Sequence, residues 1–152
     1  MNEHRLSHIG ICVSDLERSV HFYRDLLGFQ EVSRLEIEGP VTERLLDISG
    51  GSLQAVYLKM GGTVIELLYY PVAGHEPAET PRAMNKLGLT HISINVADLD
   101  VVVTAVEQGG GQQLNHTLID TGGSKAMFVT DPDGMRIELV QAMFNPDAQQ
   151  RS

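Results

Sequence analysis

Hydrophobic and polar residues alternate strictly near the start of the chain. Between residues 6 and 13 the apolar side chains of Ile9, Ile11 and Val13 share one face, and the opposite face carries His8, Gly10 and Cys12. A period of two predicts a half-buried strand. Residues 89–96 repeat this alternation and predict a second strand of the same kind.

A helical period follows each of these strands. Ser14 and Glu17 have the capping-box spacing, which predicts a helix starting after Ser14 and ending near Gly28. A second helix is predicted to end at the glycines 109–111. The apolar stripes are Leu16, Val20, Tyr23 and Leu27 in the first helix, and Leu99, Val103 and Val106 in the second.

Three further strands are expected in each half of the chain. In the first half they fall near 42–48, 53–60 and 63–70, and in the second near 113–119, 125–130 and 135–142. Residues 71–87 contain several Pro and Gly and are predicted to be a linker, and 145–152 a polar tail.

The two halves are copies of one module. The segments 8–16 and 91–99 share six identical residues at a constant offset of 83, and 62–67 matches 134–139 in Gly, Ile, Glu and Leu. His8 and Glu66 are 58 residues apart and His91 and Glu138 are 47 apart, so the first copy carries an 11-residue insertion, which we place near 33–53. The pattern predicts an α+β fold, a single domain over 1–152 in which βαβββ modules at about 5–70 and 88–142 form a cup-shaped mixed sheet.

Four residues able to bind a metal recur at matched positions. By alternation, His8, Glu66, His91 and Glu138 lie on the face that the helices do not cover. A single His or Glu in a strand is most often a structural or solvated residue. Two interior carboxylates, however, need a compensating cation, so the duplicated pattern favours one divalent ion per site, Ni, Co, Zn, Mn or Fe. Candidate substrate-binding residues are Cys12, Asn95 and Arg136.

Composition narrows the remaining function classes. The 11 Lys+Arg against 20 Asp+Glu give a net charge of -9, which disfavours nucleic-acid and membrane partners. One cysteine excludes an internal disulfide and a thiolate-rich zinc site, and a cytoplasmic protein is expected. Dinucleotide-binding, Walker and serine-hydrolase motifs are absent from the sequence.

The paired H-I-x-I-x-V-x-D-L and I-E-L segments resemble the vicinal oxygen chelate superfamily, which includes glyoxalases, bleomycin-resistance proteins and extradiol dioxygenases. The resemblance covers about residues 5–142. It implies a glyoxalase-like fold, a metal held by His8, Glu66, His91 and Glu138, a small-molecule substrate with vicinal oxygens, and a homodimer. The ligands would come from one chain or from two.

Two His with two Glu are most similar to glyoxalase I and methylmalonyl-CoA epimerase. This likeness implies a lyase or isomerase that moves a proton beside a metal-polarised carbonyl through an enediolate, with Glu66 and Glu138 as the catalytic candidates. The chain departs from glyoxalase I by having Cys12 where that enzyme has Arg, and from the epimerase near Gly50, where a second carboxylate is missing. The alternatives are a ring-cleaving extradiol-type dioxygenase, which would use three ligands, and a non-catalytic drug-binding resistance protein.

Overall fold

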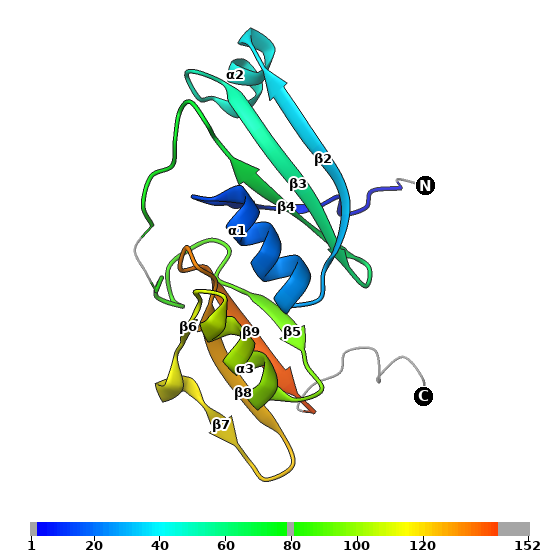
Figure 1. Ribbon diagram of the computed structural model, residues 1–152, viewed down its shortest axis with the longest axis vertical. Coiled ribbons are helices and arrows are strands. Elements are labelled where there is room, and N and C mark those ends of the chain that lie inside the picture. The colour runs from blue at the N-terminus through cyan, green and yellow to red at the C-terminus, as the bar shows by residue number, and fades with distance from the viewer. Residues whose placement is uncertain (1–2, 79–80, 143–152) are drawn as a thin grey trace. The chain divides into compact units, whose positions relative to one another are not determined.

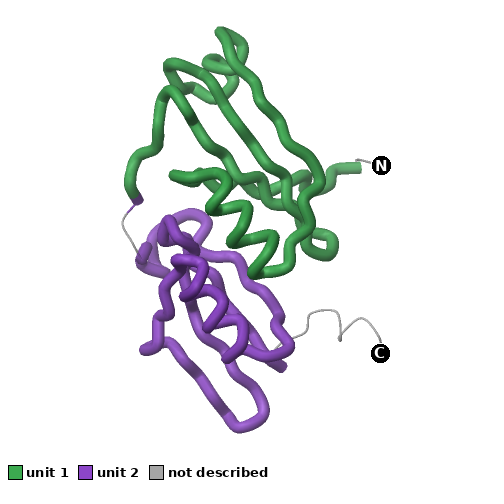
Figure 2. Tube along the Cα trace, in the orientation of Figure 1, with its two compact units in different colours: residues 1–77 green, residues 78–152 purple. Residues whose placement is uncertain are grey.

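The computed structural model describes residues 3–78 and 81–142, so the predicted tail at 145–152 lies outside the described residues. The chain divides into two compact units, residues 1–77 and 78–152, which are coloured separately in Figure 2. Each unit is described by itself. No helix in the described part of the chain combines the length and the apolar character needed to cross a membrane.

Unit 1 is a four-stranded sheet with helices. The strands run in the order β1-β4-β3-β2, with β1 parallel to β4 and the other neighbours antiparallel. Its elements are β1 (Ile9–Cys12), α1 (Leu16–Val20), the π-helical η1 (His21–Leu26), β2 (Gln30–Glu38), α2 (Pro40–Leu46), β3 (Ser52–Met60) and β4 (Thr63–Tyr69).

Unit 2 repeats this topology. Its sheet runs β5-β9-β8-β6, with β5 parallel to β9 and β7 paired to β8. The elements are β5 (Ile92–Asn95), α3 (Leu99–Gln108), β6 (Gln112–Gln113), the 3-10 turn η2 (Asn115–Thr117), β7 (Ile119–Asp120), β8 (Lys125–Thr130) and β9 (Arg136–Gln141). The predicted α+β class with mixed sheets is confirmed.

The predicted helical stripes form the core of each unit. In unit 1 the first helix lies across one face of the sheet (Figure 1), and its apolar side chains pack against Ile65 and Leu67 of β4. All seven predicted stripe residues are buried: Leu16, Val20, Tyr23, Leu27, Leu99, Val103 and Val106. Phe22 is also fully buried, because the wider π turn of η1 brings it inward together with Tyr23.

The strand predicted near 42–48 is wrong, because this segment is helix α2. Pro40 suits the first helical turn, and Asp47 ends the helix in the left-handed region at φ 55°. The strand that precedes β3 is instead β2, where Val32 is an extra residue that shifts the pairing between Glu31 and Ser33. The bulge interrupts the alternation, so β2 escapes a search for period two. Helix α2 falls inside the range assigned to the insertion, and unit 2 has no described counterpart.

The strand predicted near 113–119 is also wrong as one element. It is broken into β6, η2 and β7. The side chain of Thr117 causes the break, since its Oγ1 donates to the Leu114 carbonyl at 2.7 Å and accepts from the Phe128 amide at 2.9 Å. A side-chain hydroxyl thereby replaces a ladder hydrogen bond.

The first helix is capped by Asp15 rather than by Ser14. The Asp15 carboxylate accepts from the Arg18 amide at 3.0 Å, as Asp98 does from the Val101 amide at 3.2 Å in unit 2. The Ser14 hydroxyl accepts from the Arg18 guanidinium instead. The cap is therefore the aspartate that both copies of the repeat share, and the predicted Ser14–Glu17 capping box is wrong.

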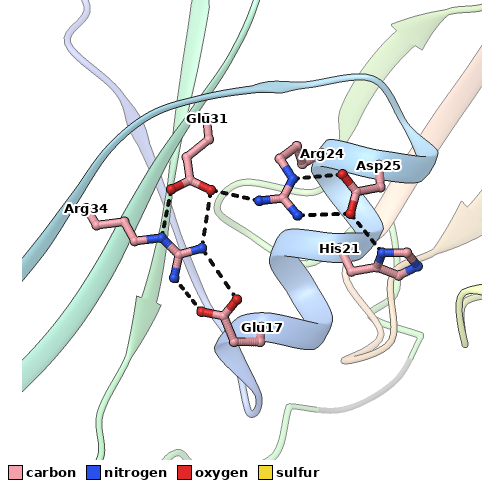
Figure 3. Close-up of polar contacts among 6 residues, drawn as sticks. All are labelled: Glu17, His21, Arg24, Asp25, Glu31 and Arg34. Carbon is pink, nitrogen blue, oxygen red and sulfur yellow. Dashed lines mark hydrogen bonds and ion pairs between the residues drawn. The ribbon is translucent and has the colours of Figure 1, made fainter.

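Charged side chains connect the first helix of unit 1 to the outer strand β2 (Figure 3). Arg34 of β2 donates to Glu17 of α1 and to Glu31 of its own strand. Arg24 joins the group by donating to Glu31 at 2.9 Å and to Asp25 at 2.7 Å. The two arginines hold the pKa of Glu31 below its ordinary value, chiefly through the hydrogen bond from Arg34.

Candidate metal site

His8 and Glu66 form a close pair in unit 1. His8 directly precedes β1, and Glu66 lies in β4 opposite Gly10, the second residue of β1. The parallel pairing of these strands brings His8 Nε2 to 3.0 Å from Glu66 Oε2. The Glu66 side chain is 10% exposed and that of His8 36% exposed, so the carboxylate is buried while the imidazole reaches solvent.

His91 and Glu138 form the matching pair in unit 2. His91 directly precedes β5, and Glu138 lies in β9 opposite Ser93. Here Nε2 lies 3.7 Å from Oε2, and the Glu138 side chain is 31% exposed. The same strand register thus produces the same His–Glu pair twice, with a looser contact and a more exposed carboxylate in unit 2.

A hydroxyl contacts the other nitrogen of each imidazole ring. Ser7 Oγ lies 3.0 Å from Nδ1 of His8, and Thr90 Oγ1 lies 2.8 Å from Nδ1 of His91. When Nδ1 carries the proton and donates it to the hydroxyl oxygen, the lone pair of Nε2 is left for a metal. Both rings therefore have a partner that can select the tautomer a metal ligand needs.

An aromatic ring stands beside each histidine. Tyr57 of β3 is the cross-strand partner of Glu66, and its ring meets His8 edge to face at 5.4 Å between centroids. Phe128 of β8 is the partner of Glu138 and meets His91 in the same way at 5.2 Å.

The tyrosines near Glu66 have perturbed acidities. A hydrogen bond to the Glu66 carboxylate, with burial, raises the pKa of Tyr57 to about 12. Burial also raises the pKa of Tyr70, with smaller contributions from the charges of Cys12 and Glu66. Tyr57 therefore stays protonated at neutral pH and acts as a hydrogen-bond donor.

The three candidate substrate-binding residues lie on the same strands as the pairs or on their neighbours. Cys12 is exposed on β1 and Asn95 is exposed on β5. Arg136 lies in β9 two residues before Glu138, so both side chains are on one face. Its Nε donates to the Arg82 carbonyl at 2.6 Å, and its guanidinium carbon lies 5.7 Å from the centre of the Phe128 ring.

The donor set fits a divalent transition metal. Imidazole nitrogen and carboxylate oxygen suit Ni, Co, Zn, Mn and Fe. Two ligand atoms each about 2.1 Å from an ion lie roughly 3.0–3.4 Å apart at ordinary bond angles, close to the observed 3.0 and 3.7 Å. Within either unit, the described residues contain no group of three or more His, Cys, Asp or Glu placed to hold an ion. Each unit therefore offers two ligands.

Sequence reasoning found both His–Glu pairs and missed the residues around them. Ser7 and Thr90 each precede a repeated histidine by one position, so a repeat search extended by one residue would have found them. Tyr57 and Phe128 could have been found only from the pairing of the last two strands in each unit. The hairpin between those strands has two loop residues after Met60 and five after Thr130, so the aromatic residues stand at different sequence distances from Glu66 and Glu138.

Comparison with known proteins gives one consistent family. Residues 5–139 match the Glyoxalase/Bleomycin resistance protein/Dioxygenase superfamily. A probable lactoylglutathione lyase of Vibrio cholerae is 32% identical over 144 residues, covering 93% of both chains. The mitochondrial methylmalonyl-CoA epimerase of Mus musculus is 28% identical over 142 residues, covering 91% of this chain and 73% of the epimerase. A crystallised glyoxalase family protein from Bacillus cereus has the same fold, with a TM-score of 0.78 at 18% identity over 93% of this chain and 97% of that one.

Proposed function

Because this chain belongs to the glyoxalase/bleomycin resistance protein/dioxygenase superfamily, we propose that it is a divalent-metal-dependent lyase or isomerase. Its substrate class is a small molecule with two adjacent oxygens. The observation that carries the proposal is the His–Glu pair found at the same register in both units. Matches to a lactoylglutathione lyase and to an epimerase support proton-transfer chemistry over ring cleavage.

The proposed ligands are His8 and Glu66 from one unit with His91 and Glu138 from the other. Either one chain or a homodimer supplies both pairs. Four protein ligands suit an ion whose remaining positions take the two oxygens of a substrate, whereas a ring-cleaving enzyme that also binds dioxygen works with three. The hydroxyls of Ser7 and Thr90 support the imidazole rings in the orientation that this role requires.

Glu138 is the better placed of the two carboxylates to move a proton. It is more exposed than Glu66 and lies farther from its histidine, so its Oε atoms can turn toward a substrate carbon. The bound ion supplies a Lewis acid that polarises the substrate carbonyl and so acidifies the neighbouring C–H bond. Glu138 then removes the proton from that carbon and returns it to an adjacent position.

Cys12, Asn95 and Arg136 are proposed substrate contacts. Arg136 carries the only positive charge on β9, and its fixed Nε leaves the two Nη groups to hydrogen-bond an anionic oxygen. Cys12 and Asn95 are exposed at matched positions on β1 and β5, where a small ligand can reach them.

Metal analysis of the purified protein tests the proposal. We expect about one divalent ion per complete set of four ligands, and its loss in His91→Ala and in Glu138→Ala. His116→Ala is the matched control, since His116 is exposed in η2 and belongs to neither pair. Full metal content in both pair variants would exclude the site.

Solvent hydrogen exchange tests the reaction class. The metal-loaded protein is incubated in D₂O with thiohemiacetals of 2-oxo aldehydes and with acyl-CoA thioesters. Deuterium incorporation beside the carbonyl of one class identifies the substrate type, and Glu138→Ala is expected to abolish it. If neither class exchanges while a catechol consumes oxygen, the protein is a dioxygenase and the proposal fails.

A further inference from the structure

Only one of the two matched carboxylates has a phenol beside it. Tyr57 and Phe128 stand at the same place in the two sheets, each opposite the glutamate and edge-on to the histidine. The Tyr57 hydroxyl hydrogen-bonds to the Glu66 carboxylate. Phe128 has no hydroxyl and gives Glu138 no such bond.

The surroundings of the two carboxylates differ accordingly. Glu66 is contacted by the His8 imidazole on one side and by the Tyr57 phenol on the other, and its residue exposure is 8%. A carboxylate held by two donors loses most of its rotational freedom. Glu138 has only the longer contact to its histidine, 3.7 Å against 3.0 Å.

We propose that Tyr57 is a positioning residue that holds Glu66 in a single orientation, so that Glu66 remains a fixed metal ligand while Glu138 stays free to turn. This inference rests on the proposed function, because it assumes that both carboxylates bind the ion. It adds a division of labour between two residues that are equivalent in the sequence repeat.

The competing explanation is that Tyr57 serves only to pack against His8. Phenylalanine at this position keeps the ring and its edge-to-face contact, and the other unit already has that arrangement with Phe128. Tyr57→Phe therefore removes the hydroxyl alone. Tyr69→Phe is the matched control, because Tyr69 lies on the same hairpin opposite Gln54, three residues from Glu66, and points to the other face of the sheet.

The first measurement is the affinity for Co²⁺, followed by its visible absorption. Loss of a group that supports a metal ligand weakens binding by about 10- to 100-fold. Tyr57→Phe is expected to raise the Co²⁺ dissociation constant by about tenfold and to alter the absorption band, and Tyr69→Phe to change neither. In a Glu66→Ala background, Tyr57→Phe is expected to have no further effect. An unchanged affinity in Tyr57→Phe, or an equal loss in the Glu66→Ala background, would overturn the proposal.

A second measurement needs no metal. In metal-free protein labelled with ¹³C at the glutamate carboxyl carbons, Tyr57→Phe is expected to shift the Glu66 resonance and leave that of Glu138 in place. If wild-type protein binds no Co²⁺, the proposed function fails, and this resonance still decides whether Tyr57 holds Glu66. A Glu66 resonance that does not move refutes the positioning role even where the metal binds.

Discussion

Tyr57 and Phe128 occupy equivalent positions in two sheets of the same topology, and only Tyr57 donates a hydrogen bond to the glutamate opposite it. Gene duplication explains the shared register, because both aromatic residues lie on the strand next to the one that carries the glutamate. The single hydroxyl makes the copies chemically different. A repeated pair of ligands can thus acquire two roles through one atom on a neighbouring strand.

A close approach between α2 and the start of β3 gives a prediction about folding. Gly51 lies against Glu43, and a Cβ at Gly51 would come within 2.6 Å of the Glu43 backbone nitrogen. We expect Gly51→Ala to lower the free energy of unfolding by about 1–3 kcal/mol, because the helix must move to accept the methyl group. Gly62→Ala is the control, since nothing lies within 4 Å of its added Cβ. Urea unfolding measures both variants, and equal midpoints would contradict the expectation.

The helix caps give a second prediction. Asp15→Ala and Asp98→Ala each remove the acceptor of a helix amide and are expected to cost about 1 kcal/mol of unfolding free energy. Ser14→Ala is expected to cost less, because Ser14 contacts the exposed Arg18 side chain and no helix amide. Thermal unfolding of the three variants tests the ranking. A larger loss in Ser14→Ala than in Asp15→Ala would restore the capping box at Ser14.

The Arg34 contacts in Figure 3 predict a pH dependence of stability. The pKa of Glu31 is lower in the folded protein than its ordinary value of 4.5, mainly because Arg34 hydrogen-bonds to it. A lowered carboxyl pKa stabilises the fold above the unfolded pKa, and this contribution disappears as the pH falls through the folded pKa. We expect Arg34→Met to cost about 0.5–1 kcal/mol at pH 7, a small value because these side chains are partly exposed.

The difference between wild type and Arg34→Met is expected to shrink below pH 4.5 as Glu31 becomes protonated. Unfolding free energies measured from pH 7 to pH 2 test this trend. Arg44→Met is the control, because Arg44 is exposed on α2 and lies outside the cluster. A constant difference across the whole range would mean that Arg34 stabilises the fold through packing of its aliphatic chain.

The sequence repeat predicted the paired ligands and the helix cores because both depend on short, regular spacings. His8 and Glu66 are far apart in the chain, yet the alternation of each strand determined the face on which each side chain lies. The helical stripes were equally local, and each became buried as expected.

The features that could not be predicted depend on interruptions of a regular pattern or on strand register. Val32 adds one residue to β2 and hides its alternation, and Thr117 uses its side chain to end a ladder. Tyr57 could not be assigned to Glu66 without the register of the hairpin. Local periodicity gives the face of a residue, whereas its partner across the sheet is determined by loop length and bulges.

The different surroundings of the two carboxylates predict different effects of the same substitution. Glu→Gln keeps an oxygen that can bind a metal and removes the ability to accept a proton. Glu138→Gln is expected to retain Co²⁺ and to lower the rate of deuterium incorporation by about 10²–10⁴-fold, the usual contribution of a general base. Glu66→Gln is expected to weaken Co²⁺ binding and, at saturating metal, to lower that rate far less. Exchange rates measured at saturating Co²⁺ separate the two effects, and a greater loss of rate in Glu66→Gln would assign the proton transfer to Glu66.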